Sequence, residues 1–212
     1  MKKQKTAIIW DLDGTLWDSC DTVAAAWNDW CRANGVDQVF TPDDCRRCCG
    51  KTLPQIAEAI FPGKDRAWAE AVVNSCCDAE CIPLAAHGGL LYPGEEELLP
   101  RLHERYFMAV VSNCGLGYIE AFFSGNQTGG YFDDYENAVR TGKTKGENIR
   151  LVMERNGIER AIYVGDTMGD CEAASAAGIP FLHAAYGFGS VPDAPAVHAF
   201  SEIPAAIEKM LP

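Results

Sequence analysis

Long apolar runs are missing from this sequence. After the basic start Met1–Lys5, only four apolar residues, 7–10, come before Asp11. A signal peptide needs an apolar segment of about 7–15 residues, and a membrane span needs about 20. No later stretch comes near that length. We therefore expect neither an export signal nor a membrane anchor, and we expect the protein in the cytoplasm.

Positive charge is also scarce. The 212 residues include 18 Lys and Arg against 30 Asp and Glu, which gives a formal net charge of −12. Such an acidic chain is poorly suited to neutralise nucleic-acid phosphates or to coat an anionic membrane. We expect neither partner, so an anionic small molecule would have to be held by a few local positive charges.

A pair of CxxC motifs is absent, although the chain has ten cysteines. Without an export signal, these cysteines are expected to be thiols or metal ligands rather than disulfides. Six of them lie in two groups within the predicted helical segment, at Cys45, Cys48 and Cys49 and at Cys76, Cys77 and Cys81. Their spacing does not match a typical zinc site, so we favour buried thiols.

The rest of the composition is that of a globular protein of one or two domains, with 48% hydrophobic and 23% charged residues. A strand pattern at 6–10 is followed by four helical patterns between 18 and 86, the last at about 65–81. Strand patterns at 107–111, 161–164 and 179–182 then alternate with helical patterns near 116–123, 147–156 and 170–177. A weak strand pattern lies at 131–138.

This alternation predicts an α/β fold, a Rossmann-like parallel sheet with helices on both faces. An all-helical segment interrupts it after the first strand. We expect a core of residues 1–17 and 93–212, and a helical cap of residues 18–92 that closes over the core.

The first predicted strand ends in two acids, Asp11 and Asp13. Ligands of parallel sheets bind at the carboxyl ends of the strands. The two-residue period of an extended chain turns both carboxylates to the same side. Carboxylates this close repel each other unless one is protonated or a cation lies between them, and oxygen ligands suit Mg²⁺. Acids are also common in ordinary turns.

Two later strands end in polar residues as well. Ser112 and Asn113 follow the strand at 107–111, although serine after a strand is also a common turn residue. Asp166 and Asp170 follow the strand at 161–164, and their spacing of four puts them on one side of a helical turn. Asp170 is either a helix N-cap or a second acid of a metal site.

A lysine precedes the helix expected at 147–156. Thr144 and Glu147 fit a capping box, which places Lys143 just outside the helix mouth, where its charge adds to the positive end of the helix dipole. Such a lysine can hold a phosphoryl group. The Gly-Lys-Thr triplet here does not complete a P-loop, because the first glycine of that motif would fall on Asn137.

Together these segments resemble the four motifs of the haloacid dehalogenase-like (HAD) superfamily, and they occur in the family's order. The DLDGT segment at Asp11–Thr15 resembles the first motif, Ser112 the second, the lysine the third, and the GDTMGD segment at Gly165–Asp170 the fourth. A helical insertion between the first two motifs resembles the C1 cap type. The turn at Tyr92–Gly94 is similar to the phosphoglycolate phosphatase-like branch.

The third motif departs from that branch, which often has Lys-Pro-x-Pro-Asp. Here the segment is KTKGE, at 143–147. With Glu147 in the place of the acid, the matching lysine is Lys143, and Lys145 is its rival.

The resemblance implies phosphoryl transfer to Asp11, with Asp13 as acid and base. It implies Mg²⁺ held by Asp11, the backbone carbonyl of Asp13, and Asp166.

It also implies that Ser112, amides near Asn113, and Lys143 bind the phosphate, with Thr15 and Asp170 in support. The expected activity is that of a Mg²⁺-dependent phosphatase acting on a small phosphorylated metabolite, as a monomer or small homo-oligomer.

Three alternatives follow from the same fold. A phosphosugar mutase resembling β-phosphoglucomutase would share every core residue, and a non-catalytic phosphometabolite-binding protein would need one of them lost, which is not seen. A dehalogenase is disfavoured because that class lacks an acid at the position of Asp13. The cap is expected to select the leaving group. Arg46, Arg47 and Lys51 are either its contacts with substrate or a solvated basic patch.

Overall fold

The computed structural model describes residues 6–211, so the basic start of the chain lies outside the described residues. The strands are β1 (Thr6–Trp10), β2 (Trp17–Asp18), β3 (Leu90–Leu91), β4 (Phe107–Ser112), β5 (Asp134–Asn137), β6 (Arg160–Gly165), β7 (Phe181–Ala184) and β8 (Ala196–Val197). The helices are α1 (Cys20–Ala33), α2 (Pro42–Arg46), α3 (Leu53–Ile60), α4 (Arg66–His87), α5 (Glu95–His103), α6 (Tyr118–Gly125), α7 (Ala138–Thr141), α8 (Lys145–Asn156), α9 (Met168–Ala177) and α10 (Ile203–Met210), with 3₁₀ turns η1 (Gly129–Tyr131) and η2 (Phe200–Glu202).

Six strands form one parallel sheet in the order β5-β4-β1-β6-β7-β8. The central strand β1 pairs with β4 on one side and β6 on the other, and Trp10 lies opposite both Val110 and Val164. This register brings the carboxyl ends of the three strands together. The sequence-predicted acids and Ser112 therefore meet at one edge of the sheet.

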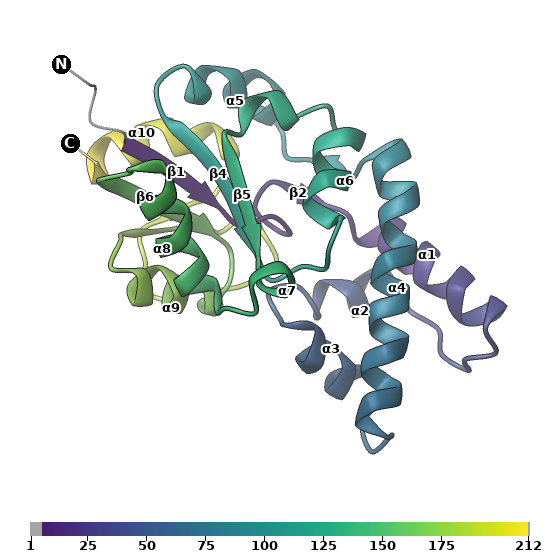
Figure 1. Ribbon diagram of the computed structural model, residues 1–212. Coiled ribbons are helices and arrows are strands. Elements are labelled where there is room, and N and C mark those ends of the chain that lie inside the picture. The colour runs from purple at the N-terminus through teal and green to yellow at the C-terminus, as the bar shows by residue number, and fades with distance from the viewer. Residues whose placement is uncertain (1–5, 212) are drawn as a thin grey trace.

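Helices cover both faces of the sheet, as predicted (Figure 1). Side chains of β1 alternate between two apolar clusters: Ile8 and Trp10 belong to one, Ala7 and Ile9 to the other. The first cluster includes residues of α5, α6 and α10, and the second includes residues of α8 and α9. Burial on both faces explains why the strand patterns of the sequence are continuously apolar. The α/β fold class is confirmed.

The segment after β1 contains the four predicted helices, α1 to α4, which lie beside the sheet (Figure 1). The expected end of the fourth helix near residue 81 is wrong, because α4 continues to His87. Pro83 lies inside it, but the fully buried Leu84 anchors the last turn in the core. The helix ends at Gly88, whose φ of +70° is unfavourable for other residues.

A short antiparallel ribbon, not predicted from the sequence, joins the two ends of the helical segment. It pairs Trp17 with Leu91 and Asp18 with Leu90. Strands of two residues are too short to show an alternating pattern. The ribbon spans the expected boundary at 17/18, and one apolar cluster includes residues of both β1 and α4. The division into a core and a cap stays a prediction.

Within residues 6–211, each helix is too short or too polar to cross a membrane.

Candidate active site

Three buried acids meet at the carboxyl end of the central strands. Asp11 directly follows β1, Asp166 directly follows β6, and Asp170 lies in the first turn of α9. One carboxylate oxygen of each lies within 4.8 Å of the others, and none of the three residues is exposed by more than 1%. Within residues 6–211, this is the group of acids, histidines or cysteines that has the geometry of a metal site.

The lysine at this cluster is Lys145, not Lys143. Its Nζ lies 2.9 Å from Asp11 Oδ1 and 2.6 Å from Asp170 Oδ1, and the residue is 6% exposed. Burial by itself lowers the pKa of Lys145, but the charges of Asp11 and Asp170 outweigh burial and raise it. Lys143 is exposed. The expectation that Lys143, rather than its rival Lys145, lies at the site is therefore wrong.

The packing of α8 against α9 explains this outcome. Thr144 and Glu147 form the predicted capping box, and Lys145 is the first helical residue. The next residue, Gly146, approaches α9 so closely that an added Cβ would lie 3.0 Å from the carbonyl oxygen of Ala173. This approach brings the first turn of α8 onto Asp170. Gly146 is the feature of the sequence that could have indicated Lys145.

Asp170 is not the N-cap of α9. Thr167 is the N-cap, and Asp170 is the third residue of a capping box. Its Oδ2 accepts from the Thr167 N–H at 2.9 Å and from the Thr167 hydroxyl at 2.6 Å, while its Oδ1 accepts from Lys145. Because both oxygens are engaged, Asp170 is suited to orient Lys145.

Asp166 has an oxygen available for a cation. Its Oδ2 accepts from the N–H groups of Phe188 at 2.8 Å and Gly189 at 3.1 Å. Its Oδ1 is buried and has no hydrogen-bond partner within the described residues. A buried oxygen without a partner is costly unless a ligand satisfies it. Gly14, with φ of +76°, lies so close that an added Cβ would be 2.3 Å from Asp166 Oδ2.

The charge of the cluster also fits a divalent metal. Burial, together with the charges of Asp170 and Asp166, raises the pKa of Asp11 to about 8 despite Lys145. Burial and Asp170 raise the pKa of Asp166 to about 7. Three carboxylates and one ammonium leave excess negative charge in a buried space, which a hard dication such as Mg²⁺ can neutralise.

The carboxylate of Asp13 is not part of this metal group. Its Oδ1 instead accepts hydrogen bonds from Trp17 Nε1 at 2.9 Å, Tyr118 Oη at 2.9 Å and Ser19 Oγ at 3.1 Å. Burial raises the pKa of Asp13, and the hydrogen bonds from Tyr118, Ser19 and Trp17 oppose that rise. A metal role for the backbone carbonyl of Asp13 stays a prediction.

These three donors were not predicted from the sequence. Trp17 was placed at the end of the first core segment and Ser19 at the start of the helical segment, and neither was given a role at the site. Tyr118 opens α6 after a glycine-rich turn, and only its place just beyond the end of β4 hints at the site.

The remaining predicted residues lie at the same edge of the sheet. Ser112 is the last residue of β4 and is 5% exposed. The side chain of Asn113 donates to the Gly50 carbonyl at 3.0 Å, so it links β4 to the loop between α2 and α3. Thr15 is fully buried, and its carbonyl accepts from the Tyr186 hydroxyl at 2.8 Å. Phosphate binding by Ser112 and Asn113, and support by Thr15, stay predictions.

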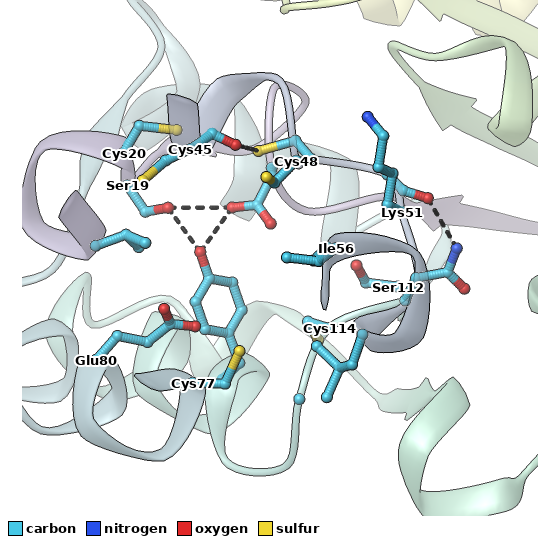
Figure 2. A pocket seen from close by; sticks show the side chains of 18 of the residues that line it. Ser19, Cys20, Cys45, Cys48, Lys51, Ile56, Cys77, Glu80, Ser112 and Cys114 are labelled. Carbon is cyan, nitrogen blue, oxygen red and sulfur yellow. Dashed lines mark hydrogen bonds between the residues drawn. The ribbon is translucent and has the colours of Figure 1, made fainter. Parts of the chain in front are cut away.

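A cavity of about 60 Å³ opens between this edge and the helices α1 to α4 (Figure 2). It is lined by Asp13, Ser112 and Asn113 and by residues of the helical segment, among them Ile56 and Glu80. Since one water needs about 10–15 Å³, the cavity has room for a few atoms only. It is suited to a small leaving group.

One of the three basic residues considered in the sequence lines this cavity. Lys51 stands at its rim (Figure 2), exposed, and donates to the Arg47 carbonyl. Arg46 instead pairs with Asp18 at 2.9 Å and with Asp43, and Arg47 pairs with Asp44. Lys51 is therefore the candidate contact for an anionic leaving group.

Cysteines form much of the cavity wall. The cavity is lined by Cys20, Cys45, Cys48, Cys49, Cys77 and Cys114. Burial raises the pKa of Cys45, Cys48, Cys77 and Cys114, so these thiols stay protonated near neutral pH. The ten cysteines of the chain are free. The thiols present a neutral, weakly polar surface to whatever enters.

The model of the haloacid dehalogenase-like hydrolase family matches residues 8–184 of the chain. The chain is also 30% identical to a phosphoglycolate phosphatase of Rhodobacter capsulatus, over 95% of this chain and 96% of that protein. It is 29% identical to a phosphoglycolate phosphatase of Synechococcus elongatus, over 86% and 84% of the two chains.

Solved structures agree in fold. A predicted phosphatase from Clostridium acetobutylicum superposes with a TM-score of 0.80 at 23% identity, over 97% of this chain and 99% of that one. CbbY from Rhodobacter sphaeroides in complex with phosphate gives 0.76 at 20% identity, over 95% and 98%. The family match spans both the sheet and the helical segment and includes the acids, Ser112 and Lys145. This chain belongs to the haloacid dehalogenase-like hydrolases.

Proposed function

We propose that this phosphatase hydrolyses a small phosphomonoester through an aspartyl-phosphate on Asp11. One observation carries the proposal: Asp11 lies against Lys145 and beside Asp166, while Asp13, two residues on, is held separately and lines the cavity. Two acids that are only two positions apart in the chain thus have different surroundings, which suits Asp11 to nucleophilic attack and Asp13 to proton transfer.

In the first step, the Asp11 carboxylate attacks phosphorus, and the bond between phosphorus and the leaving oxygen breaks. Neutral Asp13 gives its proton to that oxygen, so the alcohol departs uncharged. In the second step, Asp13 takes a proton from a water that attacks the aspartyl-phosphate. This releases inorganic phosphate and restores both side chains.

Positive charge at the phosphoryl group is supplied from one side by Lys145, whose position Asp170 fixes. Asp11 and Asp166 would hold Mg²⁺, which offsets the repulsion between carboxylate and phosphate when bound. Ser112 and amides near Asn113 would bind phosphoryl oxygens. Because charge builds on these oxygens in the transition state, such donors are the main source of rate acceleration.

The proposed substrate is 2-phosphoglycolate or a phosphomonoester of similar size. Two curated relatives are phosphoglycolate phosphatases. The cavity admits only a small leaving group, and Lys51, the basic residue of its lining, would pair with a carboxylate by turning from the Arg47 carbonyl. Glu80 is also in the cavity wall, and burial raises its pKa well above the ordinary value, which favours its neutral form.

A substrate panel tests this proposal. With Mg²⁺, we expect phosphate release to be fastest from 2-phosphoglycolate and slower from glycerol 3-phosphate, ribose 5-phosphate and AMP. Lys51→Ala should raise the KM for 2-phosphoglycolate about tenfold, as expected for one lost charged contact, and leave the KM for glycerol 3-phosphate unchanged.

Lys64→Ala, which changes another exposed lysine of the helical segment, serves as the control. Faster release from sugar phosphates would overturn the choice of substrate. An isomerised sugar phosphate that needs a bisphosphate activator would assign the protein to the mutases instead.

Metal binding is expected to depend on pH. The raised pKa values of Asp11, about 8, and Asp166, about 7, mean that both groups carry protons in the metal-free protein at pH 6. Mg²⁺ must displace these protons. The contribution of the Asp11 and Asp166 carboxyls to the stability of the metal-free fold is present at low pH and is lost as pH rises through about 7–8. The rise in Tm caused by Mg²⁺ should therefore be larger at pH 8 than at pH 6.

Differential scanning fluorimetry with and without Mg²⁺, at matched ionic strength, measures this difference. Asp166→Ala should remove most of the Mg²⁺-dependent shift at pH 8. An equal shift at both pH values, or an unchanged shift in Asp166→Ala, would contradict the metal assignment.

A further inference from the structure

Asp13 is held by a closed triangle of hydrogen-bonding atoms. Ser19 Oγ and Tyr118 Oη each approach Asp13 Oδ1, at 3.1 and 2.9 Å, and lie 2.6 Å from each other. Figure 2 shows this triangle, with Ser19 at one corner, in the wall of the cavity. Trp17 Nε1 adds a further donor to the same oxygen at 2.9 Å.

The number of protons fixes the role of Oδ1. Trp17 Nε1 can only donate a hydrogen bond. The hydroxyls of Ser19 and Tyr118 have one proton each, so together they can donate two of the three hydrogen bonds that form the triangle. Whichever way the hydroxyls turn, Trp17 and at least one hydroxyl can donate to Oδ1. No hydrogen bond from residues 6–211 reaches the other oxygen, Oδ2. Oδ1 is therefore the acceptor, and Oδ2 is left for the transferable proton.

The donors are held rigidly. Trp17, Ser19 and Tyr118 are exposed by 0%, 2% and 5%. The ring of Trp17 packs edge-on against that of Tyr118, with centroids 5.5 Å apart. They come from three places, the ribbon strand β2, the residue before α1, and the start of α6. Such a buried, packed arrangement keeps a carboxyl in one orientation, which general acid catalysis requires.

We propose that Tyr118 and Ser19 are positioning residues, which hold the carboxyl of Asp13 with Oδ2 directed at the leaving oxygen of the substrate. The inference rests on the proposed role of Asp13 as general acid. It adds that Asp13 depends on the hydroxyl of Ser19, just before α1, and on the hydroxyl of Tyr118, at the start of α6. Loss of Tyr118 Oη should therefore impair the reaction only where the leaving group needs a proton.

A comparison of leaving groups tests this proposal. The leaving group of an alkyl phosphate such as 2-phosphoglycolate departs as a strongly basic alkoxide unless it is protonated. The leaving group of 4-nitrophenyl phosphate departs as a stable phenolate. The measured quantity is kcat/KM, because it reports steps only up to departure of the leaving group. Tyr118→Phe should lower kcat/KM for the alkyl phosphate about tenfold, as for one lost hydrogen bond to an ionisable group.

The same variant should keep kcat/KM for 4-nitrophenyl phosphate within about twofold of wild type. That activity also shows that the protein has folded. Ser19→Ala is the second variant, with a smaller loss in the same direction. Tyr135→Phe is the matched control, because it removes a tyrosine hydroxyl that donates to Glu120 at 3.0 Å, away from Asp13.

Asp13→Asn distinguishes the role of Asp13 as general acid from the positioning role of Tyr118 and Ser19. If it loses activity on the alkyl phosphate selectively while Tyr118→Phe and Ser19→Ala match wild type, the positioning role is wrong and the proposed function stands. If Asp13→Asn hydrolyses both substrates as wild type does, the proposed general acid is wrong, and the positioning role is overturned with it. Equal losses on both substrates in Tyr118→Phe would also overturn the positioning role.

Discussion

Asp11→Asn is expected to abolish phosphatase turnover, with a fall in kcat of about 10⁴-fold or more, the size seen when a covalent nucleophile is removed. The amide has the shape of the carboxylate but cannot act as an anionic nucleophile. Lys145 keeps its second partner, Asp170, at 2.6 Å, so the site should remain ordered. Phosphate release with Mg²⁺ and 2-phosphoglycolate is the measurement.

Stability should separate this loss from unfolding. The folded-state pKa of Asp11 is raised to about 8, so the wild-type side chain stabilises the metal-free fold less as pH rises toward 8. Asparagine does not titrate. The Tm of metal-free Asp11→Asn should therefore equal or exceed that of wild type at pH 8, and its advantage should be smaller at pH 5.

The exposed Asp78 provides a control, since Asp78→Asn makes the same chemical change on the surface of α4. Acid-quenched wild type should carry a phosphoryl group on the peptide containing Asp11, visible by mass spectrometry, and Asp11→Asn should not. More than a trace of activity in Asp11→Asn would exclude the covalent mechanism.

Much of the site could be predicted because it depends on local pattern. Asp11, Ser112 and Asp166 each end or follow a strand whose apolar residues are continuous. Parallel pairing then brings such strand ends together without any further information. The alternation of strands and helices gave the fold class for the same reason.

The residues that sequence reasoning placed wrongly depend on contacts between elements. Lys143 was favoured over Lys145 by its place before the capping box, which the structure confirms, and by the match of Glu147 to the acid of the family's third motif. What decides the choice is how closely α8 approaches α9, and that is set by Gly146 against Ala173. Capping fixes where a helix starts, but it does not fix which face of the first turn is buried.

The surroundings of Asp13 were beyond sequence reasoning for a similar reason. Tyr118 is 105 positions away from Asp13 in the chain, and Trp17 belongs to a ribbon of two-residue strands. Neither carries a periodic signal. Their meeting depends on how the helical segment and α6 join the sheet, which is a property of the tertiary fold.

Lys145→Ala is expected to lower kcat by about 10²-fold or more, whereas Lys143→Ala should stay within about twofold of wild type. Lys145 Nζ lies 2.9 Å from the nucleophile oxygen, so its charge is close to the phosphoryl group throughout transfer. Loss of one such electrostatic donor in a buried site typically costs about 10²–10³-fold. Lys143 is exposed, and its charge is screened by water.

Loss of stability has to be distinguished from loss of catalysis in this variant. Without Lys145, Asp11 and Asp170 have no cation beside them, and removing one partner of a buried pair typically costs about 3–5 kcal/mol. The Asp11 carboxyl can escape part of that cost by binding a proton, so the loss in Tm should be larger at pH 8 than at pH 6. Activity should therefore be measured at pH 6 with saturating Mg²⁺, at a temperature where circular dichroism shows a folded protein. Under those conditions Lys145→Ala should keep the KM within a few-fold and lose kcat, since the charge acts mainly on the transition state. If Lys145→Ala matches wild type and Lys143→Ala loses kcat, the exposed lysine is the functional one, and the contact with Asp11 has no role in catalysis.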